Sequence, residues 1–277
     1  MSSPSYDVRA FREFEFAGWQ QVASNYDTFF EPISQQIAAP VLDAAHVTTG
    51  TALLDIATGP GYLAAIAAAR GATAIGVDIA ASMVDLATAK YPNARFEVGD
   101  AEHLTFADAN FDAVVGSFVL PHLTNHLEAV RGWIRVLRPG GWLAQAMWAP
   151  PDQTRIAGLF LDAARIAGAV PPKDLPAGPP FFAFSTDDAL TGLHRDAGLD
   201  EVMVRSIELH RVVASADELW NGMLNSTVRT QTTVLGQTPD VQRRIRAVFD
   251  DLAAQYQSAD GLAIPITVKI VSGRKPG

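Results

Sequence analysis

The sequence predicts an α/β fold built on a parallel β-sheet. Short apolar segments alternate with helical segments between residues 51 and 148, a pattern typical of βαβ units. Loops rich in glycine or aspartate follow the apolar segments, at the strand ends where such sheets bind ligands. Hydrophobic residues make up 48% of the 277-residue chain and charged residues 18%, so the chain can bury a large core.

The first half of the chain supplies five strands and the helices that join them. Gly71, Pro92 and the turn Pro139-Gly140-Gly141 mark the ends of three helical segments. An aromatic-rich helix over 11–36 precedes these elements. The predicted strands are 51–56, 74–77, 95–98, 111–118 and 142–148, and the predicted helices are 62–70, 82–90 and 126–137.

The second half is more helical. The capping box Ser215-Ala216-Asp217-Glu218 starts one helix, and Pro239 occupies the first position of another. No repeat and no long linker interrupts the chain, so residues 1–277 are expected to form a single domain. The remaining predicted elements are helices over 153–169 and from 185 to about 198, and strands over 201–212 and 262–271.

Charge and composition exclude several classes of function. The formal net charge of −9 repels phosphate backbones and anionic lipids, which argues against nucleic-acid and membrane partners. The chain has no cysteine, so disulfides, thiolate nucleophiles and cysteine-ligated metals are excluded, and the scattered histidines predict no metal site. The N-terminus carries charges where a secretion signal needs an apolar core, so we expect a cytoplasmic protein.

The loop Gly59-Pro60-Gly61-Tyr62-Leu63-Ala64 fits the pattern G-x-G-x-x-A, which has three interpretations. It can be a tight strand-to-helix turn without a ligand. It can hold the pyrophosphate of a nicotinamide cofactor, with Asp78 on the ribose hydroxyls. It can also hold another adenosine-bearing cofactor. Asp55, just before the loop, is unfavourable beside a pyrophosphate but favourable near an ammonium or a sulfonium.

Four motifs follow one another within residues 19–148. They are Leu54-Asp55-Ile56-Ala57-Thr58-Gly59-Pro60-Gly61; Gly76-Val77-Asp78-Ile79 with Ser82-Met83; Gly99-Asp100-Ala101-Glu102 with Leu104 and Phe106; and Phe111-Asp112-Ala113-Val114-Val115 with Arg138-Pro139-Gly140-Gly141. In this order and spacing, the chain resembles the class I S-adenosylmethionine-dependent methyltransferases of the small-molecule type, near the ubiquinone and menaquinone methylases. Ala57 replaces the family's first glycine and Thr58 a common cysteine; alanine still permits a close approach.

The resemblance implies a Rossmann-like three-layer sandwich. Its seven-stranded, mostly parallel sheet would have the order 3-2-1-4-5-7-6, with the last strand antiparallel. Helical insertions at 150–184 and 215–258 would cap the site and bind the substrate, and residues 1–36 would form an N-terminal helical lid.

The resemblance also implies the cofactor S-adenosyl-L-methionine. The glycines let the backbone approach its methionyl part, and the Asp78 carboxylate can accept bonds from its ribose hydroxyls. Asp100 can accept from the adenine amino group, while plain helix packing explains Met83 as well as an adenine contact does. The predicted cofactor-binding residues are Tyr26, Asp55, Ala57, Gly59, Gly61, Asp78, Ile79, Met83, Asp100, Ala101, Glu102, Ser117 and Phe118.

Two residues are candidates for catalysis. His122 follows the fourth strand, and its ordinary pKa near 6.5 suits a general base; alternatively, it only shapes the pocket. Tyr26 lies in the predicted lid, where its hydroxyl would reach the cofactor or the acceptor; alternatively, it is an aromatic packing residue.

The predicted function is methyl transfer to a small apolar or aromatic acceptor, on oxygen, carbon or nitrogen. Trp148, Phe181 and Phe182 are the predicted substrate-pocket residues, although they can equally bury the cap against the sheet. The alternative is a methyltransferase-fold protein that binds the cofactor without methyl transfer, as a scaffold or a cyclisation catalyst. The protein is expected to be a monomer or a homodimer.

Overall fold

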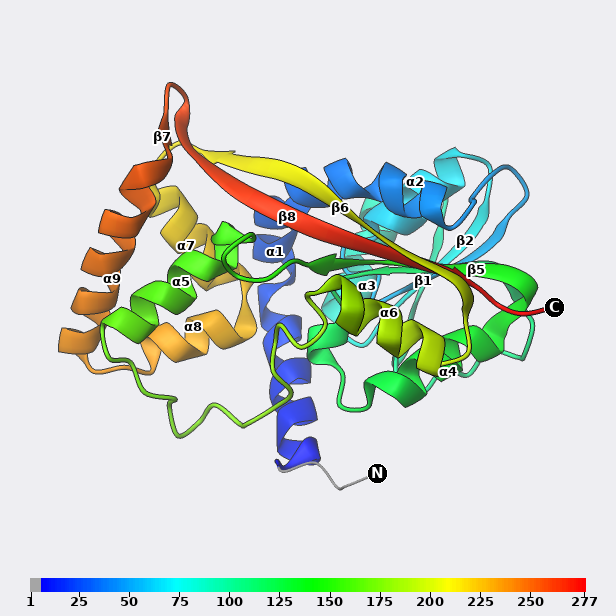
Figure 1. Ribbon diagram of the computed structural model, residues 1–277, viewed down its shortest axis with the longest axis horizontal. Helices are drawn as coiled ribbons and strands as arrows, with labels where there is room; N and C mark the ends of the chain where they lie inside the picture. Colours follow the sequence, from blue (N-terminus) through cyan, green and yellow to red (C-terminus); the bar gives the residue numbers. More distant parts are fainter. Residues whose placement is uncertain (1–5) are drawn as a thin grey trace. The chain divides into compact units, whose positions relative to one another are not determined.

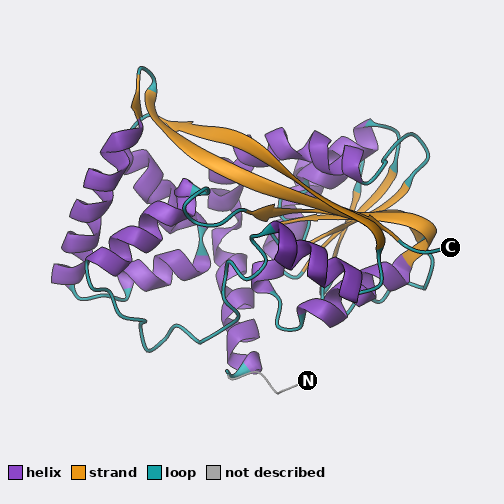
Figure 2. Ribbon diagram, viewed as in Figure 1, coloured by secondary structure: helices purple, strands orange, loops and turns teal. Residues whose placement is uncertain are grey.

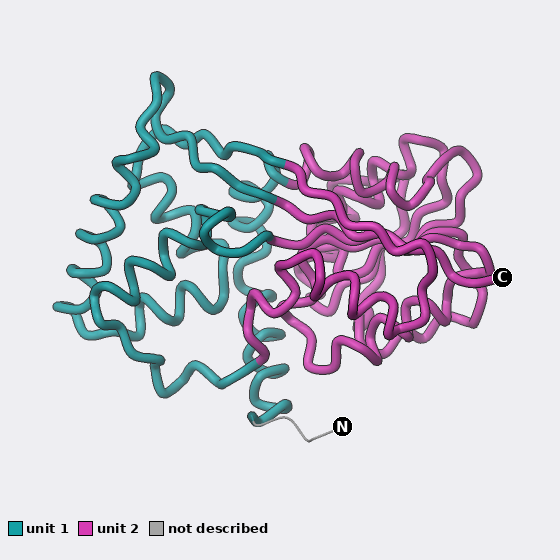
Figure 3. Tube along the Cα trace, in the orientation of Figure 1, with its two compact units in different colours: residues 1–33, 149–178, 208–267 teal, residues 34–148, 179–207, 268–277 magenta. Residues whose placement is uncertain are grey.

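The computed structural model describes residues 6–277 and is shown in Figure 1. Packing divides the chain into two compact units, each assembled from three stretches of sequence (Figure 3). Unit 1 takes its described residues from 1–33, 149–178 and 208–267; unit 2 consists of 34–148, 179–207 and 268–277. The single domain and the lid expected from the sequence stay predictions, and residues 1–5 of that lid lie outside the described residues.

The sheet has eight strands within the described part of the chain, in the order β3-β2-β1-β4-β5-β8-β6, with the short β7 paired to β8. The strands β1 to β5 pair in parallel, and β8 runs antiparallel to β5. This confirms the order and direction that the family resemblance implies, with β8 as the expected seventh strand and the two-residue β7 as an addition. The strands are β1 (Ala52–Ile56), β2 (Thr73–Asp78), β3 (Arg95–Val98), β4 (Phe111–Ser117), β5 (Leu137–Trp148), β6 (Asp200–Val213), β7 (Gln257–Ser258) and β8 (Gly261–Arg274).

Helices cover both faces of the sheet in unit 2. Figure 2 shows α2 on one side of the strands and the pair α4 and α6 on the other. α2 packs on β1 and β2, α3 on β2 and β3, and α4 on β4, β5 and α6. These elements are α2 (Tyr62–Ala69), α3 (Ala81–Lys90), the 3-10 helix η1 (Leu120–His122), α4 (His126–Val136) and α6 (Asp187–Asp196).

The alternation of side chains along β1 separates the core from the candidate site. Leu54 and Ile56 point into the cluster of buried residues that includes Trp133 of α4. Asp55, between them, therefore points to the opposite face, where α2 lies. The α4 face is a packed apolar core, and the α2 face carries a buried carboxylate.

Unit 1 is mainly helical. Its helices pack around the rings of Phe160, Trp220 and Phe249, with centroids of neighbouring rings 4.7 to 5.4 Å apart. The predicted capping box is present, because Ser215 Oγ accepts a hydrogen bond from Glu218 N at the start of α7. The helices are α5 (Arg155–Ile166), α7 (Ala216–Ser226), α8 (Val228–Leu235), α9 (Pro239–Ala253), η2 (Ala254–Tyr256) and the first part of α1 (Val8–Ala44).

Several elements are longer than the sequence predicts, and α1 and β5 differ most. α1 begins at Val8 and ends at Ala44 instead of spanning 11–36, and β5 begins at Leu137 instead of 142. The register shows why the start of β5 looked like a turn. Phe111 pairs with Leu137 and Ala113 with Trp142, so residues 138–141 bulge out of the ladder between the two pairs.

Candidate active site

The carboxyl ends of the parallel strands meet at one edge of the sheet in unit 2. Asp55 of β1 pairs with Gly76 of β2 and with Val115 of β4, and Ser117 at the end of β4 pairs with Ala146 of β5. Residues that are far apart in the sequence are thereby brought to one edge, where open α/β sheets bind ligands.

The turn after β1 holds an unusual run of backbone conformations. Ala57, Gly59 and Gly61 all have positive φ angles, of 52°, 52° and 91°. Two hydrogen bonds fix the turn to its neighbours: Thr58 N donates to Val77 O at 2.9 Å, and Gly61 N donates to Thr58 O at 3.0 Å. Gly61 is the N-cap of α2, so the turn presents the N-terminus of a helix to the site.

The two glycines of this turn have different reasons to be glycine. A Cβ on Gly61 would lie 2.8 Å from a Phe96 ring carbon and 2.9 Å from Ala87 Cβ, so packing against β3 and α3 excludes a side chain. A Cβ on Gly59 would meet no atom within 4 Å. Gly59 therefore faces open space, and only its positive φ favours glycine there.

Asp55 is a buried carboxylate with one unused oxygen. Its side chain is 1% exposed; Oδ2 accepts hydrogen bonds from Thr58 Oγ1 at 2.5 Å and from Ala64 N at 3.2 Å. Oδ1 is buried without a hydrogen-bond partner. Burial, aided by the charge of Asp78, raises the pKa of Asp55 to about 7, against the bonds from Thr58 and Ala64.

Asp78, at the end of β2, is the second buried carboxylate. Its oxygens accept hydrogen bonds from Gly59 N and Ala80 N, each at 2.9 Å. Burial raises its pKa, while these backbone bonds and the nearby His122 oppose the rise. Asp55 and Asp78 thus form an acidic pair on either side of the glycine turn, an arrangement that favours a ligand with cationic and hydroxyl groups.

The loop after β3 carries the next predicted residues. Asp100 Oδ1 accepts a hydrogen bond from Glu102 N at 2.9 Å, and Asp100 Oδ2 lies 2.9 Å from His103 Nδ1. Ala101 is half-buried, and its carbonyl accepts a hydrogen bond from Trp133 Nε1 at 2.7 Å. The other two residues predicted to contact the adenine come from neighbouring elements. Met83 is buried on α3, and Ile79 is half-buried directly after β2.

The loop after β4 begins with a strained aromatic residue. Phe118 has a φ of +60°, and its N–H donates to Ala146 O at 2.8 Å. Its ring stacks on Trp148 at the end of β5, with centroids 3.7 Å apart and planes 8° apart. Ser117 Oγ, just before it, is buried without a hydrogen-bond partner. A bulky residue in this conformation persists only where surrounding contacts fix it, as at functional sites.

Three more predicted residues meet in unit 2. His122 belongs to η1 and lies edge-on to Phe181, with ring centroids 6.0 Å apart; Phe181 packs in turn on Phe182 at 5.1 Å. Tyr26 lies in unit 1, where its ring contacts Trp19 at 5.4 Å and Phe30 at 4.8 Å. Its place beside a cofactor stays a prediction.

The sequence analysis missed several supporting residues. Thr58 appeared only as a departure from a family pattern, yet its hydroxyl is the closest partner of Asp55. The contacts of Gly61 with Ala87 and Phe96 were not predicted, because these residues lie 26 and 35 positions further along the chain and no local signal links them. Nothing in the sequence indicated that the Glu102 carboxylate accepts hydrogen bonds from Thr124 and Asn125; its contact with the cofactor stays a prediction.

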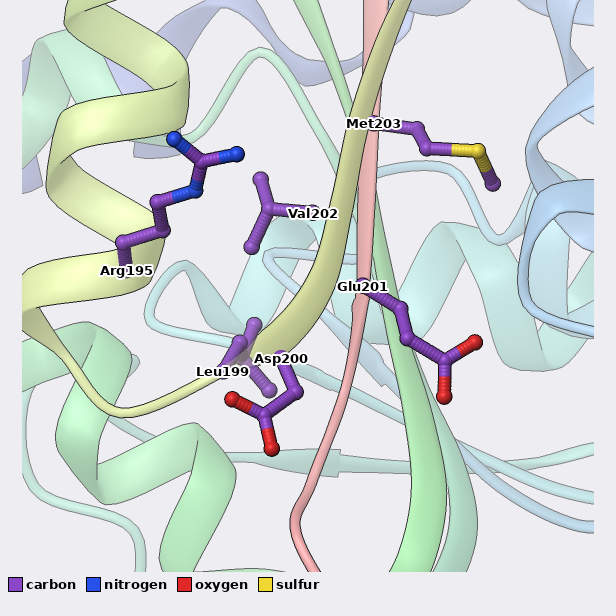
Figure 4. A pocket seen from close by; sticks show the side chains of 6 residues that line it. All are labelled: Arg195, Leu199, Asp200, Glu201, Val202 and Met203. Carbon is purple, nitrogen blue, oxygen red and sulfur yellow. The ribbon is translucent and has the colours of Figure 1, made fainter.

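A surface pocket in unit 2 lies away from this edge. It is formed where α6 leads into β6, and Arg274, in the part of β8 that pairs with the start of β5, forms an ion pair with Glu201 there. Figure 4 shows Arg195 reaching from α6 toward the strand, and Met203 directed to the other side of it. The side chains diverge and make no polar constellation. The lining residues are Arg195, Leu199, Asp200, Glu201, Val202 and Met203.

Two general features are absent from residues 6–277. None of the helices there is both long and apolar enough to span a bilayer. In the same residues, no group of three or more histidine or carboxylate side chains is arranged to hold a metal ion.

Comparison with known proteins identifies relatives of this fold. Residues 54–145 match the family described as methyltransferase domain. A demethylmenaquinone methyltransferase of Beutenbergia cavernae is 34% identical over 119 residues, which are 43% of this chain and 50% of the relative. Phosphoethanolamine N-methyltransferase 2 of Haemonchus contortus, solved with phosphomonomethylethanolamine and S-adenosylhomocysteine, has a TM-score of 0.59 at 17% identity, covering 96% of this chain and 60% of its own.

A third likeness is to a protein with another activity in its name. The structure of the cyclase SpnF has a TM-score of 0.51 at 19% identity and covers 88% of this chain and 81% of its own. The likenesses to solved structures show a shared fold. The chain spans about half the length of the demethylmenaquinone methyltransferase of Beutenbergia cavernae.

We expect different costs for alanine at the two glycines. Gly61→Ala should lower the free energy of unfolding by about 2–4 kcal/mol, because the new Cβ overlaps Phe96 and Ala87 and φ is positive. Gly59→Ala should cost only about 1 kcal/mol, for the positive φ alone. Urea unfolding followed by circular dichroism measures both. Equal losses in the two variants would contradict the packing argument.

Asp55 should make stability depend on pH. Its pKa is about 7 in the folded protein and 3.8 in the reference state, so its contribution is fully present below pH 4 and is lost as the pH rises through 7. Asp55→Asn removes this titration. Between pH 4 and pH 7, the unfolding free energy of the wild type should fall by on the order of 2–4 kcal/mol more than that of the variant. Urea unfolding at a series of pH values measures both proteins. If the unfolding free energy of the two proteins changes equally with pH across this range, Asp55 is not the titrating group.

Proposed function

We propose, from the match of residues 54–145 to the methyltransferase-domain family, that the protein binds S-adenosylmethionine and transfers its methyl group to a small molecule. The observation that carries the proposal is the acidic pair Asp55 and Asp78 on either side of the glycine turn, with Asp55 Oδ1 buried and without a hydrogen-bond partner. A cation at this point would relieve the cost of burying two carboxylates together.

The residues present fit the groups of this cofactor. Asp55 Oδ1 can accept from an ammonium. The Asp78 carboxylate, beside its bonds from backbone N–H groups, can still accept from a ribose hydroxyl. The open space at Gly59 admits a close approach of the methionyl part to the N-terminus of α2. Asp100, Ala101, Ile79 and Met83 are proposed for the adenine.

When bound, the cofactor supplies a methyl group on a positively charged sulfonium, which needs no further activation. The protein's part is then to hold the acceptor in line and to remove its proton where it has one. We assign the proton to the imidazole of His122. Phe181 lies edge-on to this ring and Phe182 packs on Phe181, which suits an acceptor with an apolar or aromatic body.

The acceptor itself is proposed only as a class. The strained Phe118 and its stacking partner Trp148 add two more aromatic rings at the ends of β4 and β5. The net charge of −9 disfavours nucleic acid and favours a small molecule. The helical segments within 1–36, 150–184 and 215–258 are proposed as lid and caps, and Tyr26 as a residue of the lid. The demethylmenaquinone methyltransferase covers only 43% of this chain, so its acceptor is not carried over.

A second candidate function is cofactor binding without methyl transfer. The fold likeness to the cyclase SpnF favours it, because that protein's name gives an activity other than methyl transfer. The two functions differ in whether S-adenosylhomocysteine is formed. Incubation with S-adenosylmethionine and a panel of phenols, quinols and amines should release S-adenosylhomocysteine with at least one of them. Binding of the cofactor without this release for any member would favour the second candidate.

The carboxylate of Asp78 should decide cofactor affinity. We expect Asp78→Asn to weaken the binding of S-adenosylhomocysteine by about 10- to 150-fold, which corresponds to about 1.5–3 kcal/mol for lost charge-assisted bonds. Titration calorimetry measures it. The matched control is Asp85→Asn, which removes the same charge at an exposed position of α3 and should leave the affinity unchanged. Similar affinities in the two variants would remove Asp78 from the site.

His122 should decide turnover rather than cofactor binding. If its imidazole takes the acceptor's proton, His122→Ala should lower turnover by about 10²- to 10⁴-fold and leave cofactor affinity within about twofold. The rate of S-adenosylhomocysteine release measures turnover for the acceptor found in the panel. His210→Ala, at an exposed position of β6, serves as the control. A loss below about threefold would make His122 a residue that lines the pocket.

A further inference from the structure

The Glu102 carboxylate connects two loops that the proposed function uses separately. Its Oε1 accepts hydrogen bonds from Thr124 N at 2.9 Å, Thr124 Oγ1 at 2.8 Å and Asn125 N at 2.7 Å. Its Oε2 lies 3.1 Å from the same hydroxyl. Glu102 follows β3 beside Asp100, whereas Thr124 lies two residues beyond His122. One side chain thus bridges 22 residues of sequence between the adenine side of the site and the proposed base.

A carboxylate suits this position for an electrostatic reason. Asn125 is the N-cap of α4, and its side chain accepts from Glu128 N at 3.4 Å. The N–H groups of Thr124 and Asn125 therefore point outward just ahead of a helix N-terminus, where negative charge is stabilised. Glutamine at 102 would offer one neutral acceptor oxygen, and alanine none.

Further bonds fix both sides of this bridge. The carbonyl of Ala101 accepts from the indole of Trp133, which is fully buried in α4. The ring of His126 lies with Nε2 3.0 Å from Leu120 O, at the start of η1. The segment that carries His122 is thus held by Leu120 on one side and by Thr124 on the other.

The bridge also reaches the proposed cofactor contact. Glu102 N donates to Asp100 Oδ1 at 2.9 Å, so the backbone of Glu102 is fixed by the side chain assigned to the adenine. We propose that Glu102 is a positioning residue. It fixes the position of His122 and couples that position to the binding of a ligand at the 100–102 loop. The coupling to a ligand rests on the proposed function; the link from Glu102 to the η1 segment does not.

Amide hydrogen exchange of residues 118–125 tests the link in the free protein. Glu102→Ala should raise the exchange rates of this segment by about tenfold or more, and Glu102→Gln should restore most of the protection. Thr124→Val, which keeps the N–H and removes only the hydroxyl, should give a smaller rise. The matched control Glu128→Ala removes an exposed carboxylate from the first turn of α4 and should leave residues 118–123 unchanged. Exchange in Glu102→Ala equal to that of the wild type overturns the link.

The same experiment with S-adenosylhomocysteine tests the coupling. In the wild type, the ligand should slow exchange both at 100–102 and at 118–125. In Glu102→Ala, it should slow only the first segment. Equal slowing of both segments in the variant overturns the coupling. Failure of the wild type to bind the ligand overturns the proposed function instead, and the free-protein comparison still decides the link.

Kinetics separates positioning from a general structural role. Turnover in Glu102→Ala should fall about 10- to 100-fold, with cofactor affinity and the KM of the acceptor within about threefold. Glu102→Gln keeps one acceptor oxygen, so it should recover part of the turnover, with a kcat that stays below that of the wild type. If Glu102→Ala fails to fold, Glu102→Gln and Thr124→Val carry the test, since both should show a kcat defect without a KM defect. A wild-type kcat in these two variants contradicts the proposal.

Discussion

Burial of two carboxylates at the ends of neighbouring strands is the constraint on which the site depends. Asp55 is 1% exposed and Asp78 is 8% exposed, and their charges raise each other's cost of ionisation. The backbone offsets this cost. Gly59 N and Ala80 N bond to Asp78, and Ala64 N at the start of α2 bonds to Asp55. The turn that carries Gly59 N and leads into Ala64 passes through positive φ at Ala57, Gly59 and Gly61. The backbone of this turn thus serves the acidic pair, while packing against Phe96 and Ala87 adds a separate reason for glycine at 61.

Carboxylate-to-backbone bonds recur at other points of the same sheet. Asp112 Oδ2 accepts from Ala52 N at 2.8 Å, which anchors the start of β1 to β4. Glu102 does the same for the loop before α4. In each case an N–H that has no partner in a helix or ladder is satisfied by a side chain far away in sequence. Unit 2 thus orders its loops at both edges of the sheet through acidic residues, which agrees with the chain's negative charge.

Local signals were sufficient for most of unit 2. The strand over 95–98 has the predicted bounds. The sheet order agrees with the one implied by the family that the four motifs resemble. Asp55, Asp78 and Asp100 could be chosen as candidates because each lies at or just beyond the carboxyl end of an apolar strand. The hydrogen bonds of Glu102 and Thr58 could not be predicted, because only the folded chain brings their partners close. The start of β5 was missed because Pro139 and two glycines resemble a helix end, and only pairing with Phe111 shows that the strand begins before them.

The same physics explains why the acidic pair suits a transient ligand better than a permanent partner. With a pKa of about 7, Asp55 is close to half protonated at neutral pH, so the free protein does not bear the full cost of two buried charges. A cation near Oδ1 would favour the ionised form, so binding of such a ligand would release the proton, and its departure would return it and relieve the repulsion. A salt bridge to a lysine or arginine would remove this flexibility, because it would keep Asp55 ionised and occupy the oxygen that is now unpartnered. The site therefore keeps its binding capacity by leaving one buried carboxylate oxygen without a protein partner.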